Sequence, residues 1–132
     1  MISIATPYLL YLGDADAEFG AKTAEGVLHW RPEQCLGQAR RPGCTLDLRL
    51  NDLSFEEAVA QGAKSLLIGV TNRGGILPEH WVPDLTAALE AGLDIANGLH
   101  QRLVDIPLIR ETAAKHGRKL HDVRHPPKNL PT

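Results

Sequence analysis

The 132-residue sequence lacks any run of lysine or arginine, and its formal net charge is only −2. Proteins that hold nucleic acid or anionic membrane surfaces usually present a basic patch, so we expect neither as a partner. No apolar segment approaches the roughly 18 residues that a bilayer-spanning helix needs. An apolar patch at residues 8–12 has no basic leader before it, so the start of the chain does not resemble a secretion signal.

Cysteine is nearly absent, because the chain contains only Cys35 and Cys44. With so few cysteines and no secretion signal, we expect reduced thiols in a cytoplasmic protein rather than a disulfide or a reactive thiol. Hydrophobic residues make up 43% and charged residues 23% of the chain, as in ordinary globular domains. The length suits one domain with its own core and is too short for two.

Two nucleotide-binding signatures are also missing. Gly69 and Gly74 have the outer spacing of a Walker loop, but Gly75 and Ile76 stand where that loop needs Lys and Ser or Thr. Without the lysine, the β- and γ-phosphates have no partner, which excludes an ATP-binding P-loop here. The sequence contains no Gly-x-Gly-x-x-Gly, so ordinary dinucleotide binding is unsupported.

What the sequence does contain is a recurring unit: a helical pattern, a glycine, and then a short apolar strand. The glycine stands where a helix C-terminus favours positive φ. Ser54 with Glu57 fits a helix capping box, and Pro83 fits a first helical turn. The three glycines that separate helix from strand are Gly62, Gly92 and Gly117.

The first half of the chain continues this alternation. Residues 8–13 predict a strand and residues 21–30 a helix, while residues 34–39 and 45–50 are two further strand candidates joined by a turn at residues 40–43. Strands that alternate with helices imply right-handed crossovers. The sequence therefore predicts an α/β fold, a Rossmann-like three-layer domain with a mainly parallel open sheet.

The end of the chain has a different composition. Residues 126–132 are rich in proline, which suits neither a helix nor a central strand. We expect a Rossmann-like domain over residues 1–125 and a linker over residues 126–132, within a longer protein.

Ligands of open α/β sheets bind beyond the carboxyl ends of the strands. We expect four loops there, at residues 13–22, 71–78, 97–102 and 122–126. The second loop supplies the predicted substrate-binding residues. Arg73 would hold a carboxylate or phosphate of the substrate. The alternative is that this loop is only a solvated turn. The predicted substrate-binding residues are Thr71, Asn72, Arg73, Gly74 and Gly75.

The other loops add single candidates. His100 would act as a base or an anion ligand, or is a surface histidine without a role. Arg124 is a second substrate-binding candidate, or forms an ordinary pair with Asp122 on an edge strand. His121 and His125 share a strand face, but no Glu or Cys nearby completes a metal site, so we predict no metal.

The first loop holds an acidic stretch and a helix start. Asp14 and Asp16 would bind a cation or lie in a solvated loop. Lys22 and Thr23, at the helix start, would face an anionic cofactor group. The basic residues of the four loops together suggest a cleft for an anionic small molecule.

Five blocks in order resemble one family, the D-glutamate N-acetyltransferases, long a domain of unknown function. The blocks are MISIATPYLLYLGD, AKTAEGV..WRPEQCLGQ, GV.N.GG.LP..W, AALEAGLDIANGLH and LHDVRHP. The resemblance implies a Rossmann-like N-terminal domain followed by a P-loop-like C-terminal domain, which would be absent from this chain.

This resemblance implies transfer of an acetyl group from acetyl-CoA, as co-substrate, to D-glutamate in D-amino-acid breakdown. From chemistry and position, we predict His100 as the catalytic proton acceptor, Arg73 and Arg124 as carboxylate ligands, and the amides of Gly74 and Gly75 as oxyanion donors. We expect the domain to be inactive alone and to form a homo-oligomer. Two other hypotheses are a non-catalytic binding or oligomerisation module and a nicotinamide-dependent oxidoreductase domain.

Overall fold

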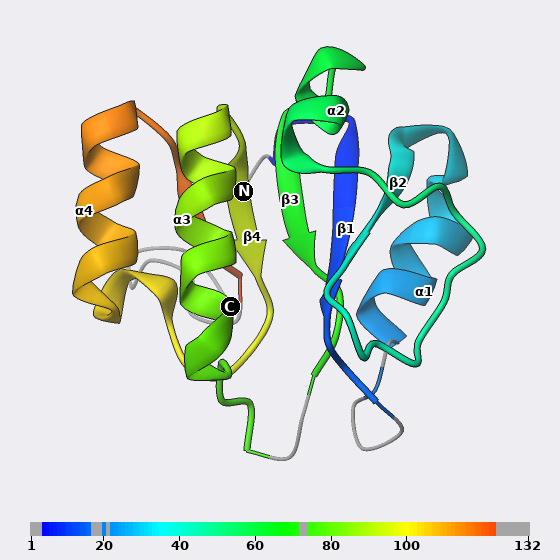
Figure 1. The fold of residues 1–132 in the computed structure, drawn as a ribbon, viewed down its shortest axis with the longest axis horizontal. Helices are drawn as coiled ribbons and strands as arrows, with labels where there is room; N and C mark the ends of the chain where they lie inside the picture. Colours follow the sequence, from blue (N-terminus) through cyan, green and yellow to red (C-terminus); the bar gives the residue numbers. More distant parts are fainter. Residues whose placement is uncertain (1–3, 17–19, 21, 72–73, 124–132) are drawn as a thin grey trace, which may run out of the picture.

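A computed structural model describes residues 4–16, 20, 22–71 and 74–123 of the chain. Its five strands form one sheet in the order β2-β1-β3-β4-β5, and each neighbouring pair is parallel (Figure 1). This is the α/β, Rossmann-like arrangement that the helix–glycine–strand pattern predicts, and the sheet is parallel throughout these strands.

The elements follow one another as alternating strands and helices. The first half contains β1 (Tyr8–Gly13), α1 (Lys22–Trp30), the 3-10 turn η1 (Pro32–Gln34), β2 (Cys35–Arg40), α2 (Phe55–Ala60) and β3 (Ser65–Ile68). The second half contains η2 (Glu79–Trp81), α3 (Val82–Ala91), β4 (Asp94–Asn97), η3 (Leu103–Asp105), α4 (Pro107–His116) and β5 (Leu120–Asp122).

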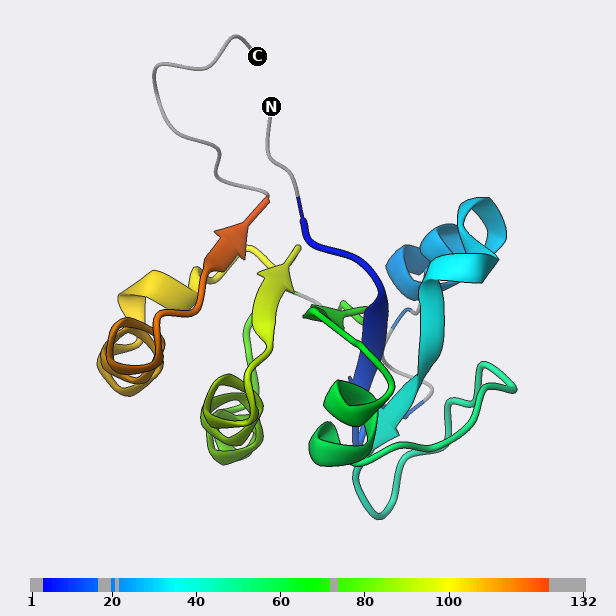
Figure 2. The same cartoon turned by 90° about the horizontal axis from the view of Figure 1, so that it is seen from above.

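The helices form two layers of unequal size. Helix α1 covers one face of the sheet near β1 and β2, whereas α2, α3 and α4 cover the other face (Figure 2). The chain steps from β1 to β2 in one direction and builds β3, β4 and β5 in the other. Since the crossovers are right-handed, this reversal puts α1 opposite the other helices. The switch point lies between β1 and β3, where α/β folds bind ligands.

Local signals in the sequence act as predicted. The Ser54 hydroxyl accepts a hydrogen bond from the Glu57 amide at 3.0 Å, and the Glu57 carboxylate accepts one from the Ser54 amide at 2.9 Å, which completes the capping box. Gly92 and Gly117 end α3 and α4 with φ of 109° and 65°. Pro83 lies in the first turn of α3.

The core fills both faces of the sheet, and its largest side chains lie toward the three-helix layer. Leu9, Leu66 and Ile95 are paired across β1, β3 and β4 and are fully buried. Trp81, also fully buried, contacts the Tyr11 ring edge-on with ring centroids 5.3 Å apart. No helix in the described part of the chain is both long and apolar enough to cross a membrane.

One predicted strand is wrong. Residues 45–50 form an irregular loop, not a half-exposed strand. The alternation in this segment has another cause, since Leu46, Leu48 and Leu50 pack partly against the core. Apolar side chains every second residue fit a loop lying along the domain as well as they fit a strand.

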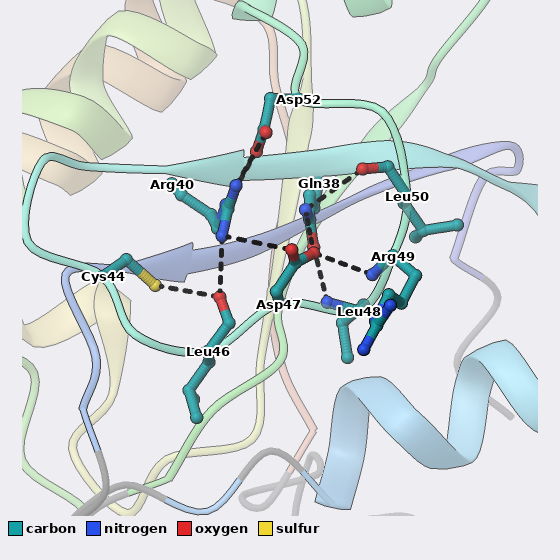
Figure 3. A network of polar contacts seen from close by, with 9 residues as sticks. All are labelled: Gln38, Arg40, Cys44, Leu46, Asp47, Leu48, Arg49, Leu50 and Asp52. Atoms are coloured by element: carbon teal, nitrogen blue, oxygen red, sulfur yellow. Dashed lines mark hydrogen bonds and ion pairs between the residues drawn. The ribbon is translucent and has the colours of Figure 1, made fainter.

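This loop is fixed by the buried side chain of Gln38 on β2 (Figure 3). The Gln38 amide nitrogen donates to the Asp47 carboxylate at 2.9 Å and to the Leu50 carbonyl at 3.1 Å. Its oxygen accepts from the Leu48 amide at 2.9 Å. A buried side-chain amide costs free energy unless its hydrogen bonds are made. The loop supplies these bonds to Gln38, and Gln38 in turn holds the loop on the strand.

Arg40, at the end of β2, holds the same loop from a second point (Figure 3). Its guanidinium donates two hydrogen bonds of 2.7 Å to Asp52 and one of 3.1 Å to the Leu46 carbonyl. This paired geometry is the strongest that arginine makes with a carboxylate. The loop after β2 therefore forms part of the carboxyl edge of the sheet, where the sequence predicted only four other loops.

Candidate functional site

The loops after β1 and β3 meet at the switch point. Gly20 and Thr71 exchange two backbone hydrogen bonds of 2.8 Å each. In the first turn of α1, the Ala24 amide donates to the Gly69 carbonyl at 3.1 Å, and a Cβ on Gly69 would fall 2.5 Å from that of Ala24. The predicted residue Thr71 is therefore joined to the loop that leads into the start of α1.

Two further predicted residues come together from separate loops. A Cβ on Gly75 would lie 2.7 Å from the backbone nitrogen of His100, and the Gly75 carbonyl accepts a hydrogen bond from Gln101 at 2.9 Å. His100 is exposed. The predicted site residues outside the described part of the chain are Asn72, Arg73 and Arg124.

The loop that carries His100 is fastened to the edge strand. Asn97 donates to Asp122 at 2.9 Å and accepts from the Leu99 amide at 3.0 Å. Asp122 also accepts from the Leu103 amide at 2.8 Å. These polar residues hold two loops in place. Arg124, the arginine of the suggested Asp–Arg pair, lies outside the described part of the chain, so that pair stays a prediction.

The predicted cofactor-binding residues line a groove of about 430 Å³ along α1. Lys22 and Thr23 stand at the N-terminal end of the helix, and Arg31 lies beyond its C-terminal end. Apolar side chains of the sheet and helix line the rest, and Trp30 is 80% exposed beside it. His100 does not line this groove.

A second cleft of about 430 Å³ opens where β1 and β2 end. It contains Arg40 and Arg41, which sequence reasoning did not select because residues 45–50 were expected to be a strand. Arg41 lies 3.0 Å from Asp84, and this carboxylate raises the pKa of the guanidinium. Neither arginine belongs to the predicted set, and carboxylates already engage both of them.

Tyr11 joins this cleft to the core. Its hydroxyl donates to the Asp84 carboxylate at 2.5 Å. Burial, followed by the adjacent Asp84 carboxylate, raises the pKa of Tyr11 well above its usual range. Tyr11 is therefore a neutral hydrogen-bond donor at any ordinary pH.

A separate polar cluster joins Asp14, just after β1, to η2. One Asp14 carboxylate oxygen lies 2.7 Å from Nε2 of His80, and the other accepts a hydrogen bond from the Trp81 indole at 2.7 Å. The bond from Trp81 is the main cause that lowers the pKa of Asp14, and His80 adds to it. The sequence suggested a cation site or a solvated loop for Asp14; the carboxylate instead binds two side chains.

Sequence reasoning missed His80 entirely. It stands 66 positions from Asp14, and no local pattern connects the two residues. Only the crossover from β3 to α3 brings them together. The contact between Asp14 and His80 could be predicted only by someone who knew that η2 packs beneath the end of β1.

Metal-binding residue types do not gather in the described residues, where no group of three or more His, Cys, Asp or Glu is close enough to hold an ion. Nε2 of His121 is buried and has no hydrogen-bond partner among the described residues. His125, its predicted companion, lies outside the described part of the chain.

Comparison with known proteins identifies the domain. Residues 39–126 match the family described as a domain of unknown function, DUF1611_N, a Rossmann-like domain. The chain belongs to the DUF1611_N family. The parallel sheet and its helices agree with the Rossmann-like description, and membership confirms the resemblance seen in the sequence blocks.

Curated relatives of this DUF1611_N domain carry an enzymatic name. The chain is 49% identical over 128 residues to a D-glutamate N-acetyltransferase of Tritonibacter scottomollicae, covering 97% of this chain and 38% of the relative. It is 38% identical over 125 residues to a D-glutamate N-acetyltransferase of a Pseudoalteromonas species, covering 95% and 38%. The chain thus spans less than two fifths of the length of the curated relatives it matches.

Solved structures resemble the DUF1611_N domain in fold. A DUF1611 family protein from Anabaena variabilis superposes with a TM-score of 0.70 at 25% identity, over 96% of this chain and 39% of that one. A homoserine dehydrogenase of Staphylococcus aureus gives a TM-score of 0.52 at 14% identity, over 86% and 31%. The second likeness shows the fold alone, because Rossmann-like domains serve many chemistries.

Proposed function

We propose that this domain is part of an N-acetyltransferase that transfers an acetyl group from acetyl-CoA to the amino group of D-glutamate. The observation that carries the proposal is the 49% identity, over 97% of the chain, to a protein named for that activity. The second named relative, at 38% identity, supports it. The matched segment, 97% of the chain, includes the loops that we propose to form the site as well as the core.

The reaction needs a proton acceptor for the amine and donors for the charge that develops on the thioester oxygen. The backbone and Cβ of His100 lie against Gly75, which supports a role for His100 near this glycine turn. In this proposal the amides of Gly74 and Gly75 face the developing oxyanion. His100 either accepts the proton or contacts a carboxylate of the substrate.

The substrates are anionic, so cationic groups must hold them. Arg73 and Arg124, with Thr71 and Asn72, are the proposed ligands of the D-glutamate carboxylates. The groove along α1 is the proposed site of the acyl donor. It has cationic side chains near both ends and an apolar lining between them, which suits a molecule with phosphates and an apolar arm; the cationic residues are Lys22 and Arg31.

The proposed partner is the polypeptide that the relatives carry beyond the matched segment. The chain covers only 38% of each curated relative, and the predicted site residues Thr71 and His100 follow β3 and β4, at the carboxyl edge of the sheet. We propose that a further domain closes this edge and completes the site. The domain by itself then has little or no activity.

The proposal is tested with a fusion enzyme in which this chain replaces the matched segment of the Tritonibacter relative. Acetylation of D-glutamate is followed by thiol release from acetyl-CoA and by mass spectrometry of the product, with L-glutamate as the control acceptor. We expect turnover of D-glutamate by the fusion and none by the 132-residue chain alone. A folded fusion that acetylates no D-glutamate rejects the proposed activity.

A second candidate, a non-catalytic binding or assembly module, is favoured by one observation. Trp30 is 80% exposed beside the apolar groove along α1. Large exposed aromatic side chains next to a groove commonly mark contact surfaces. Sedimentation of the chain and of Trp30→Ala distinguishes the two: self-association that depends on Trp30, with unchanged turnover in the fusion, favours the module.

A further inference from the structure

Asp14 and His80 have the geometry of a base held by a carboxylate. Nε2 of His80 lies 2.7 Å from an Asp14 oxygen. The pKa of Asp14 is lowered, so at neutral pH its carboxylate is ionised and can only accept. Nε2 must therefore carry the hydrogen. In the neutral ring this leaves the lone pair on Nδ1, the nitrogen that can take up a proton.

The carboxylate is itself fixed by a buried group. Its second oxygen accepts a 2.7 Å hydrogen bond from the indole of Trp81, which is fully buried and packed against Tyr11. A side chain held by a core residue keeps one orientation. Asp14 thus sets both the position and the tautomer of His80, as the third member of a catalytic triad does for its histidine.

His80 nevertheless remains open to ligands. Its side chain is 53% exposed, and Nδ1 makes no hydrogen bond with any described residue. The pair stands just beyond the carboxyl end of β1, a strand that flanks the switch point. An ordinary surface ion pair would lack both the buried anchor and the fixed tautomer of the imidazole.

We infer that His80 is the general base for the attacking amine and that Asp14 is its positioning residue, a step that rests on the proposed acyl transfer. The amine nitrogen attacks the thioester carbonyl carbon, and Nδ1 of His80 takes the proton that nitrogen releases. The C–N bond forms, the C–S bond breaks, and the leaving thiolate receives the proton from the imidazolium. His100 then takes the other of its two roles, a contact with substrate carboxylate.

Three further polar groups, Arg41, Asp84 and Tyr11, lie close to the Asp14–His80 pair. Arg41 donates to the His80 carbonyl at 3.3 Å and pairs with Asp84, which accepts from Tyr11. The positive charge of Arg41 and the negative charge of Asp84 offset one another, and Tyr11 is neutral. A general base acts only in its unprotonated form, so the proposal predicts an acidic limb, a fall of log kcat toward low pH, that depends on His80.

The test uses the fusion enzyme with His80→Gln, Asp14→Asn and, as the control, His116→Gln, an exposed histidine at the end of α4. Thermal unfolding first shows that all variants are folded. We expect kcat to fall about 100-fold or more for His80→Gln, with loss of the acidic limb, since a general base contributes this much. Asp14→Asn presents an N–H to Nε2, places the hydrogen on Nδ1 and loses activity similarly.

The possible outcomes separate the two proposals. An unsubstituted fusion that acetylates no D-glutamate rejects the proposed function and this inference with it. An active fusion in which His80→Gln keeps its rate and its acidic limb rejects the base assignment alone. Equal losses in His80→Gln and His116→Gln would also reject it, because they would show a general effect on the fold.

Discussion

Gly13 lies directly against the indole of Trp81. A methyl group at Gly13 would overlap Cε2 and Cζ2 of the indole, and Gly13 has a positive φ of 58°. The residue that ends β1 therefore has no space for a side chain and a backbone conformation that side chains disfavour. This close approach seats Trp81 under the strand, where its N–H reaches Asp14.

Gly13→Ala is predicted to lower the free energy of unfolding by about 2–3 kcal/mol, because the added methyl overpacks the core and strains the backbone. Gly26→Ala is the matched control: a Cβ there meets no atom within 4 Å, and Gly26 lies inside α1. It should raise the stability by about 0.5–1 kcal/mol through helix propensity. Urea unfolding of both variants measures the difference, and equal effects would contradict the packing argument.

Gly75→Ala is predicted to displace His100, because the new Cβ would lie 2.7 Å from its backbone nitrogen and its Cβ. Gly74→Ala provides a control with similar backbone strain, since Gly74 has φ of 87° but its Cβ would meet only Ile76 at 3.7 Å. In the fusion enzyme we expect Gly75→Ala to reduce kcat/KM about tenfold to a hundredfold more than Gly74→Ala does. Similar kcat/KM values for the two variants would show that the position of His100 does not matter for the reaction.

Gln38→Ala is predicted to release the loop at residues 41–53. The substitution removes three hydrogen bonds and leaves the Leu48 amide and the Leu50 carbonyl without this partner. We expect a loss of about 2–3 kcal/mol in the free energy of unfolding, together with faster hydrogen exchange at the Leu48 amide.

Gln34→Ala is the control for this experiment, because the Gln34 side chain makes no hydrogen bond with any described residue. Its effect should stay within about 0.5 kcal/mol. Unchanged exchange at Leu48 in Gln38→Ala would show that other contacts, such as those of Arg40, suffice to hold the loop.

Alkaline pH is predicted to destabilise the domain through Tyr11. The pKa of Tyr11 is raised in the folded protein above its ordinary value of 10.0. The unfolded chain then loses this proton first, so the stabilisation is complete below pH 10 and declines as pH rises above it, by up to about 1.4 kcal/mol per pH unit.

Tyr11→Phe isolates this contribution from lysine titration. The variant is less stable at pH 8 by about 1.5–3 kcal/mol, since it removes a hydrogen bond to a charged acceptor. Above pH 10 the gap between the two proteins should narrow in denaturant titrations. A constant gap up to pH 11 would mean that Tyr11 ionises in the folded state as readily as in the unfolded one.

The sequence alone was sufficient for the alternation of strand and helix. Ser54, Glu57, Gly92 and Gly117 act through hydrogen bonds and backbone angles within a few residues, so their effect could be predicted locally. The same local reasoning failed at residues 45–50, where alternation of apolar residues came from packing against the domain rather than from strand pairing.

Sequence position also determined which loops share the carboxyl edge of the sheet, since parallel strands place their ends together. Which side chains meet there was decided by the tertiary structure. Asp14 contacts His80 only because Trp81 packs into the space that the missing side chain of Gly13 leaves beneath β1. Such a contact depends on how residues 66 positions apart pack together. Local preferences along a chain carry no information about which distant residues meet in space.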